Sequence, residues 1–215
     1  MNPDELQLAL KHLRSRDPVI RIQFDHVGPF TLRLERNRFR MLVRSIVSQQ
    51  ISTSAARSIR RRVESLVAPA KLTADRLAVL EIDQLRSAGL SNQKATYILD
   101  LACKVRDGEV QLRNVGRMPD EDVIGELTKV KGIGVWTAQM FLIFSLGRLD
   151  VLPHDDLGIR TAIRDFYALD VLPDKKKSEE IARAWRPYAS VASWYCWRSL
   201  DMRRVAKSNG DGYPA

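Results

Sequence analysis

The sequence predicts an all-helical protein, and two observations carry that prediction. Apolar residues recur at helical spacing, three or four positions apart, along nearly the whole chain. Glycine and proline, which end helices, separate these periodic segments, whereas the alternating pattern of a β-strand is scarce. The chain has 215 residues, 45% of them hydrophobic, which is enough for a substantial core in one large domain or two small lobes.

The expected helices follow one another along the chain. The first carries Leu6, Leu10 and Leu13, and the others occupy residues 39–63, 77–85, 95–105, 123–130, 135–146, 157–167 and 181–197. Segment 18–34 has no clear helical period, so we expect an extended entry into the first long helix. Lysines 175–177 are expected in a solvated loop before a helix that begins near Ser178. Residues 206–215 have little to bury, and we expect a flexible tail there.

The charge balance favours a polyanionic partner. Lys and Arg number 35 against 26 Asp and Glu, which gives a formal net charge of +9 and an isoelectric point near 9.8. Cys103 and Cys196 lie in apolar helical patterns without a CxxC motif, and His12, His26 and His154 are scattered. The sequence therefore supports neither a disulfide framework nor a catalytic transition metal, zinc site or iron–sulfur cluster.

The sequence also bears on the cellular compartment. Its start is acidic and lacks the apolar core of a signal peptide, and no apolar run approaches the length of a membrane span. We therefore expect a protein that is not secreted and not bound to a membrane. It would act in the cytoplasm, at the bacterial nucleoid, or in the nucleus of a eukaryote.

The segment 127–138 is the most informative motif. Gly132 and Gly134 bracket one apolar residue between two helical patterns, so the chain can turn tightly and present bare backbone amides. Amides at the start of the helix near Val135 would suit a phosphate group, assisted by the positive end of the helix dipole. The alternative is an ordinary turn between two helices with glycine after the first helix.

An acidic pair, Asp155-Asp156, opens the next apolar helix. The pair is typical of an N-cap and first helical turn, and a carboxylate fixed there could also stabilise a developing positive charge. Together with Val130, the glycine turn and Thr137-Ala138, this arrangement resembles the helix-hairpin-helix DNA glycosylase superfamily, in its alkylation-specific branch.

The resemblance extends over about residues 5–200 and implies a two-lobed helical fold with the active site in the cleft between the lobes. Residues 1–205 would form a single glycosylase unit, in which about residues 40–150 make the middle lobe and the two termini make the other. The chain resembles a short form of 3-methyladenine DNA glycosylase II, without the mixed α/β domain that precedes the catalytic core in the longer protein.

The resemblance also implies the catalytic group. Asp156 stands twenty residues after Trp136, the spacing at which the family carries its catalytic aspartate, so Asp155 would be the helix cap and Asp156 the reacting group. Family members that also cut the strand have a lysine nucleophile at the position of Trp136, and an indole cannot form a Schiff base. The expectation is hydrolysis alone, with Lys131 in a backbone-binding role.

Two further segments match the family. Ser48-Gln49-Gln50-Ile51-Ser52 resembles the segment that fills the duplex when a nucleotide is turned out, which implies Gln50 as the inserted side chain. The alternative is a polar patch that interrupts a helix. Trp136 and Trp197 match positions that line the base pocket, where aromatic faces favour a cationic base. Trp185, Trp194 and Tyr195 are expected in the core.

The remaining expected contacts come from positive side chains and backbone groups. Beside Gln50, the residues expected to bind DNA are Lys131, Arg57, Arg61 and the backbone at Gly132 and Gly134. By resemblance, the carbonyls of Thr128, Val130 and Gly132 would hold a structural Na⁺ or K⁺, and no cofactor is required. Arg198 departs from the longer family member, which has tyrosine there.

The resemblance implies a monomeric enzyme that releases alkylated purines, such as 3-methyladenine and 7-methylguanine, from double-stranded DNA by base flipping in base excision repair. A different class of protein fits the same charge and hairpin. It would bind distorted or damaged DNA through the helix-hairpin-helix without excising a base.

Overall fold

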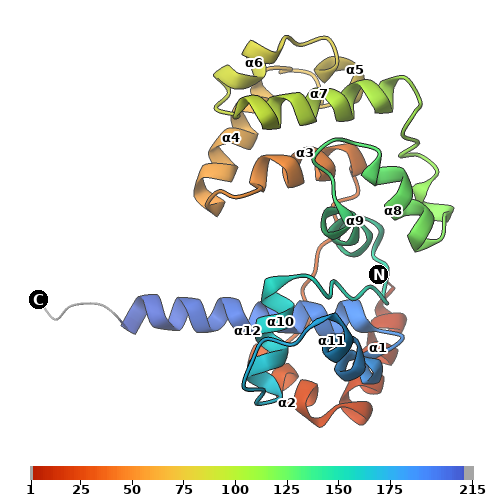
Figure 1. Ribbon diagram of the computed structural model, residues 1–215, viewed down its shortest axis with the longest axis vertical. Helices are drawn as coiled ribbons and strands as arrows, with labels where there is room; N and C mark the ends of the chain where they lie inside the picture. The colour runs from red at the N-terminus through yellow and green to blue at the C-terminus, as the bar shows by residue number, and fades with distance from the viewer. Residues whose placement is uncertain (1, 211–215) are drawn as a thin grey trace, which may run out of the picture. The chain divides into compact units, whose positions relative to one another are not determined.

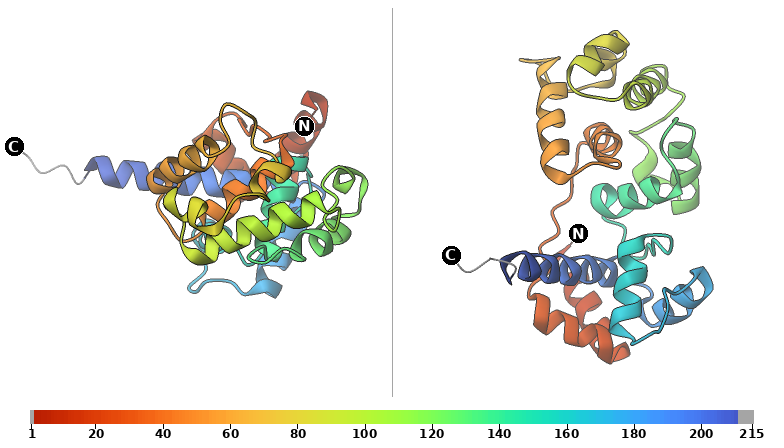
Figure 2. Two further views of the ribbon diagram at one scale, coloured as in Figure 1. Left: turned by 90° about the horizontal axis from the view of Figure 1, so that it is seen from above. Right: turned by 60° about the vertical axis from the view of Figure 1, so that its left-hand side comes forward.

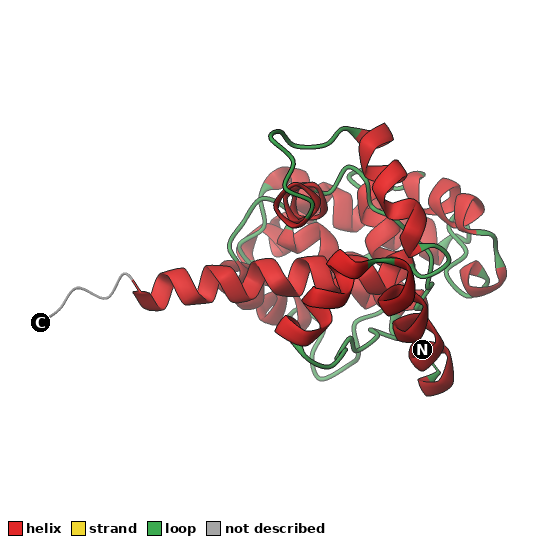
Figure 3. Ribbon diagram, turned by 90° about the horizontal axis from the view of Figure 1, so that it is seen from below, coloured by secondary structure: helices red, strands yellow, loops and turns green. Residues whose placement is uncertain are grey.

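The computed structural model describes residues 2–210, with side chains described as far as residue 204. Every regular element among these residues is helical, which confirms the expected all-α class (Figure 3). The chain divides into two compact units. The terminal unit comprises Met1–Arg33 and Gly147–Ala215, and the middle unit comprises Leu34–Leu146. None of the described helices is long and apolar enough to cross a membrane.

The terminal unit joins helices from both ends of the chain. Its helices are α1 (Pro3–Arg16), α2 (Pro18–Val27), α10 (Leu157–Phe166), α11 (Lys175–Ala182), a 3-10 turn (Arg183–Trp185) and α12 (Ala189–Gly210). The first part of α12 packs against α2 and α10, so red and blue segments of Figure 1 lie side by side. Their shared core includes the wholly buried Trp185 and Cys196.

A buried carboxylate organises the corner between α1 and α2. Asp17 caps α2 by accepting hydrogen bonds from the backbone amides of Val19 and Ile20, at 2.9 and 3.1 Å. The other oxygen of Asp17 accepts from the Trp185 indole at 2.9 Å and from the Tyr167 hydroxyl. Burial raises the pKa of Tyr167, so this phenol remains a proton donor. These bonds connect α2 to the end of α10 and to the turn before α12.

Three predictions about local structure were wrong in the terminal unit. Residues 18–27 form α2 rather than an extended segment, because Asp17 caps the helix, Pro18 suits its first position, and Ile20, Phe24 and Val27 form an apolar stripe. Residues 175–177 form the first turn of α11, because Asp174 caps it through the Lys177 amide. The helix α12 continues to Gly210, five residues into the expected tail, and 211–215 lie outside the described residues.

Three expected helices are divided by local signals. A turn at Gln49–Ser52 separates α3 (Arg38–Ser48) from α4 (Thr53–Ser65), where Ser52 caps α4 through the Ala55 amide. A capping box of Glu81 and Gln84 starts α6 (Ile82–Ser87) after the short helix α5 (Ala74–Leu77). The segment 181–197 breaks at Arg186–Pro187, because proline has no amide hydrogen to continue the helix.

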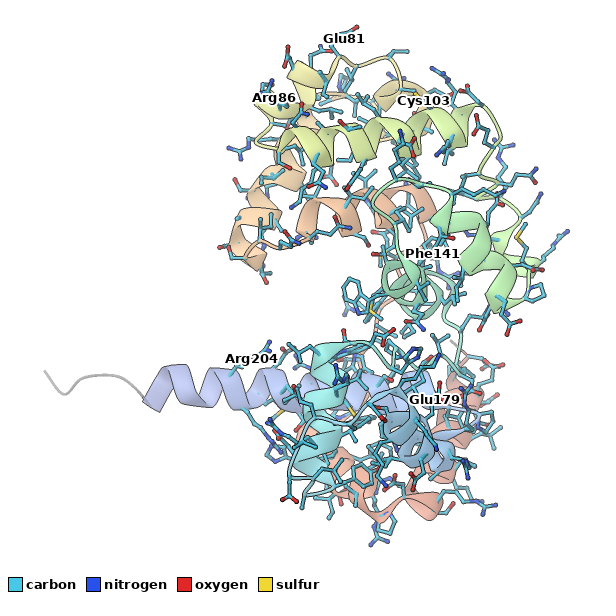
Figure 4. The ribbon with its side chains drawn as sticks, in the orientation of Figure 1. Glu81, Arg86, Cys103, Phe141, Glu179 and Arg204 are labelled. Atoms are coloured by element: carbon cyan, nitrogen blue, oxygen red, sulfur yellow. The ribbon has the colours of Figure 1, made fainter. Side chains whose placement is uncertain are left out.

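The middle unit is built around α3 and α7. After α3–α6, the unit continues with α7 (Asn92–Arg106), a 3-10 turn (Val115–Arg117), α8 (Asp120–Thr128), α9 (Val135–Phe141) and a π-helical turn (Leu142–Leu146). α3 packs against α4, α7 and α9, and α7 also covers α5 and α6 (Figure 2). Phe141, labelled in Figure 4, is fully buried on α9. The hairpin between α8 and α9 thus starts and ends on packed helices.

The two chain segments at the boundary of the middle unit are joined inside that unit. The Glu35 amide donates to the Phe144 carbonyl at 2.9 Å, and the Ser145 hydroxyl donates to the Glu35 carbonyl at 2.8 Å. Arg40 and Arg44 each lie 2.8 Å from the Glu35 carboxylate. Burial alone would raise the pKa of Glu35, but its hydrogen bonds and these two cations lower the pKa overall.

Replacement of Asp17 tests the corner of the terminal unit. Asp17→Ala removes the cap of α2 and the carboxylate acceptor of two aromatic side chains, so we expect it to lower the free energy of unfolding by about 3 kcal/mol. Asp25→Ala is the control, because Asp25 is exposed on the same helix and forms only a surface ion pair with Arg14. Its expected loss is at most about 0.5 kcal/mol. Urea unfolding followed by tryptophan fluorescence measures the loss of stability in both variants. Equal losses would contradict the role of Asp17 as helix cap and acceptor.

Candidate active site

The two glycines of the hairpin serve different purposes. Gly132 has a φ of +81°, and a β-carbon there would overlap the Tyr97 ring, so both the turn and the close approach to α7 require glycine. Gly134 is the N-cap of α9 with a φ of −94°, and a β-carbon there would meet nothing within 4 Å. No side-chain hydrogen bond caps the start of α9.

Side chains of α7 hold the hairpin backbone. The Asp100 carboxylate accepts a hydrogen bond from the Lys131 amide at 2.8 Å, and the Lys104 ammonium donates to the Lys129 carbonyl at 2.6 Å. Asp100 and Lys104 are themselves paired at 3.0 Å. Val130 is almost wholly buried, while the Lys131 side chain is exposed. The contacts with α7 therefore fix the hairpin backbone, and the exposed Lys131 ammonium can bind an anion from solvent.

The turn between α3 and α4 contacts the hairpin directly. The Gln49 side-chain amide donates to the Gly132 carbonyl at 2.8 Å. The next residue, Gln50, is exposed and has a φ of +56°, in the left-handed region that side chains other than glycine rarely adopt. The predicted helix interruption is thus a defined turn with an unusual backbone at Gln50. Sequence analysis identified Gln50 but missed the role of Gln49.

Positive side chains follow this turn on α4. Arg57 and Arg61 are exposed and stand four residues apart, so they share one face of the helix. The Arg62 guanidinium instead lies over Gly89, where a β-carbon would come within 2.5 Å of it. On the hairpin, the Lys129 ammonium pairs with Glu126 at 2.5 Å. Arg57, Arg61 and Lys131 are therefore exposed positive groups near the turn and the hairpin that could bind an external anion.

The two aspartates before α10 have different contacts, and the prediction that Asp155 caps the helix was wrong. Asp156, not Asp155, is the N-cap of α10, because its Oδ1 accepts from the Ile159 amide at 2.8 Å. The same oxygen accepts from the Trp197 indole at 2.9 Å. Asp155 is exposed and lies 3.2 Å from His154. Adjacent aspartates offer the same side chain to a cap, so the sequence alone could not distinguish them.

Gly158 leaves the space in which Asp156 and Trp197 meet. A β-carbon at Gly158 would lie 2.9 Å from the Asp156 Oδ1 atom and 3.2 Å from the Trp197 Cδ1 atom. Glycine in the first turn of a helix weakens it, so this position has a local cost. Sequence analysis missed Gly158. The available signal was a glycine inside an expected helix, at a position where no turn requires one. The carboxylate, the indole and this glycine form one compact arrangement in the terminal unit.

The five aromatic residues singled out in the sequence differ in burial. Trp185, Trp194 and Tyr195 are buried, which confirms their predicted place in the core. Trp197 is half-buried beside Asp156, whereas Trp136 is 44% exposed near the start of α9. The structure therefore brings Trp197 to Asp156 in the terminal unit. Within the middle unit, it brings the turn that carries Gln50 to the hairpin that precedes Trp136.

Metal ligands do not gather in the part of the chain that the structure describes. No group of three or more histidine, cysteine or acidic side chains there could hold a metal ion. Both cysteines are free thiols, and burial raises the pKa of the Cys196 thiol. Within the terminal unit, the candidate site brings together the Asp156 carboxylate, the Trp197 indole and Gly158.

The helices α8 and α9, joined by the glycine hairpin, form a helix-hairpin-helix motif within an all-helical fold. The sequence model described as "HhH-GPD superfamily base excision DNA repair protein" matches residues 43–187, and the chain belongs to this superfamily.

Relatives and solved structures agree with this membership. The chain is 31% identical over 204 residues to the putative DNA-3-methyladenine glycosylase YfjP of Bacillus subtilis, covering 92% of this chain and 70% of that protein. The complex of Schizosaccharomyces pombe 3-methyladenine DNA glycosylase (Mag1) with abasic DNA superposes with a TM-score of 0.82 at 30% identity, covering 90% of this chain and 96% of the other. A DNA-3-methyladenine glycosidase structure from Bacillus halodurans gives a TM-score of 0.81 at 35% identity, covering 92% and 91%.

The two hairpin glycines provide a matched pair of substitutions. Gly132→Ala forces an alanine into the left-handed region and against the Tyr97 ring, so we expect it to lower the free energy of unfolding by about 2–4 kcal/mol. Gly134→Ala meets no atom, and its expected loss is below about 1 kcal/mol. Urea unfolding monitored by circular dichroism compares the two variants. A loss at Gly134 equal to that at Gly132 would refute this account of the hairpin.

Proposed function

We propose that the protein is a monofunctional DNA glycosylase that hydrolyses the N-glycosidic bond of alkylated purines, such as 3-methyladenine and 7-methylguanine, in double-stranded DNA. The observation that carries the proposal is the Asp156 carboxylate, whose Oδ1 accepts from both the Ile159 amide and the Trp197 indole. Membership of a base excision DNA repair superfamily and relatives named as 3-methyladenine glycosylases support it.

The proposed reaction needs an anion beside the sugar. When the bond between C1′ and the base nitrogen breaks, its electron pair leaves with the base and positive charge develops on the sugar. A rigidly held carboxylate stabilises that charge without reorganisation during the reaction. Asp156 would also orient the water whose oxygen bonds to C1′ and whose proton is released. Its place at the start of α10 and its two donors supply the required rigidity.

The aromatic side chains support a preference for alkylated purines. Alkylation at N3 or N7 makes the base cationic, so it leaves as a neutral molecule and needs no general acid. The faces of Trp136 and Trp197 would bind such a ring by stacking and cation–π attraction. The Trp136 side chain is 44% exposed. Neutral damaged bases would gain less from the same pocket.

Residues at the hairpin favour hydrolysis without strand cleavage. By its resemblance to the family, Trp136 would occupy the position at which strand-cutting members carry a nucleophilic lysine, and an indole forms no Schiff base. Lys131 is exposed, but its backbone is fixed by Asp100 in the hairpin, where its charge suits a phosphate. We therefore assign Lys131 to DNA binding and propose water as the only nucleophile.

DNA binding would combine the hairpin with the positive face of α4. Backbone amides after Gly132 and Gly134 would bind a phosphate, and Arg57, Arg61 and Lys131 would add salt-dependent attraction. Gln50, exposed on its turn, would fill the gap left by the extruded nucleotide. None of these contacts reads base sequence, which suits an enzyme that must find damage anywhere.

A structural Na⁺ or K⁺ fits the hairpin carbonyls. The Val130 carbonyl accepts from the Ile133 amide and the Gly132 carbonyl accepts from Gln49, which leaves each oxygen a second lone pair. Neutral carbonyl oxygens suit a hard cation, and the Thr128 carbonyl belongs to the same turn. When bound, the ion would add positive charge near the phosphate. We propose no other cofactor.

The proposed enzyme acts as a monomer on damaged duplex DNA. Its expected compartment is one that holds DNA, either the cytoplasm with its nucleoid or the nucleus. The net charge of +9 supports a polyanionic partner.

Release of free bases from methylated duplex DNA tests this function. We expect Asp156→Asn to slow base release by at least about a hundredfold, because the amide keeps the shape of the side chain but cannot neutralise the sugar cation. Affinity for undamaged DNA should stay unchanged. Asp155→Asn is the control and should release bases at the wild-type rate.

Two results would contradict the proposal. Equal release by the wild type and Asp156→Asn would remove Asp156 from the reaction. DNA binding without base release by either protein would instead favour the class that binds distorted DNA. In the same assay, borohydride trapping of a covalent protein–DNA adduct would refute hydrolysis by water alone.

A further inference from the structure

One face of α7 holds both segments proposed to contact DNA from the middle unit. Lys94, Tyr97, Asp100 and Lys104 are spaced three, three and four residues apart, so they form a single stripe along the helix. The last three contact the hairpin, at Gly132, Lys131 and Lys129. Lys94 is the member that contacts the turn between α3 and α4.

Lys94 binds the end of α3 with its ammonium group. Its Nζ donates to the Val47 carbonyl at 2.9 Å and to the Gln49 carbonyl at 2.5 Å. Both carbonyls lie at the end of α3, which terminates at Ser48. The last carbonyls of a helix have no partner within it, and a cation there also interacts favourably with the helix dipole. The ammonium is half-buried, and this burial lowers the pKa of Lys94.

The contacts of Lys94 lie next to a strained backbone position. Gln50, with its φ of +56°, directly follows Gln49, and helix ends that need this conformation usually place glycine there. A residue with a longer side chain keeps this backbone conformation only when surrounding contacts fix it. Here Lys94 fixes the Gln49 carbonyl, and Gln49 in turn donates to the Gly132 carbonyl of the hairpin.

We propose that Lys94 is a positioning residue that holds the α3–α4 turn against the hairpin, so that Gln50 is already oriented for insertion into the duplex. This inference rests on the proposed function, because it assigns Gln50 the role of filling the gap. A side chain fixed before binding loses less conformational freedom when it enters DNA. Lys94 thereby acts through Gln50 rather than on the substrate itself.

The experiment compares variants of the full chain in single-turnover base release from methylated duplex. Lys94→Met keeps the apolar stem and removes the ammonium, and Gln49→Met cuts the next link to the hairpin. Lys71→Met is the control, since Lys71 is exposed in the same unit and outside the proposed machinery. We expect losses on the order of tenfold for Lys94→Met and no loss for Lys71→Met.

A double-mutant cycle separates positioning from general damage to the fold. If Lys94 acts through Gln50, the double variant Lys94→Met, Gln50→Ala should lose about as much activity as the more impaired single variant. Two independent effects would multiply, and that result would overturn the inference. Should Lys94→Met fail to fold, the same cycle with Gln49→Met applies, with the same two outcomes.

Hydrogen exchange of the free protein tests the inference without relying on activity. We expect Lys94→Met to speed amide exchange in residues 49–52 and 132–134 by about tenfold, and to leave α10 unchanged. Unchanged exchange in the turn would overturn the role of Lys94. If the wild type releases no base, the proposed function fails, and this exchange measurement alone decides whether Lys94 fixes the turn.

Discussion

The candidate site depends on one shared oxygen. Asp156 Oδ1 accepts from the Ile159 amide and from the Trp197 indole, so the carboxylate is fixed to α10 and to α12 at once. Gly158 leaves room for this contact, because any β-carbon there would crowd both side chains. A carboxylate with this little freedom can stabilise a cation without first rearranging. In this interpretation, Trp197 both positions the carboxylate and offers its ring to the base.

In the middle unit, too, hydrogen bonds fix the parts of the proposed site, but here the bonded groups are backbone carbonyls and amides. Side chains from a single face of α7 bind backbone groups of two segments that lie far apart in sequence. Because these hydrogen bonds from α7 go to backbone atoms of the two segments, the side chains that the segments expose to solvent can have different functions. Gln50 and Lys131 are both exposed at segments fixed in this way, as an inserted side chain and a phosphate ligand require. The half-buried stripe of α7 thus holds both segments through their backbone atoms.

The sequence predicted the helical class, because apolar periodicity reports directly on buried helix faces. It failed where the deciding contact is a single cap or a distant partner. Asp17 starts α2, yet its other partners, Trp185 and Tyr167, lie some 150 residues or more further on. Asp156 and Asp155 are equivalent until the Ile159 amide and the Trp197 indole select one of them.

Long-range polar contacts also explain the missed positioning residues. Lys94 stands just before the helix expected at 95–105 and Gln49 inside the helix expected at 39–63, and only the folded chain brings them to the Gln49 and Gly132 carbonyls. By contrast, the two hairpin glycines stand out in a local motif, and the resemblance to the family singles out Gln50. The sequence thus predicted candidate segments and left out the contacts that hold them in place.

The most direct test of the central claim is the affinity for DNA that carries a cationic azasugar, compared with an uncharged abasic analogue of the same shape. The cationic sugar mimics the charge of the transition state, so the account predicts at least about tenfold tighter binding of the cationic form by the wild type. It also predicts that Asp156→Asn loses this preference. An equal preference in wild type and variant would show that the Asp156 carboxylate does not stabilise the sugar cation.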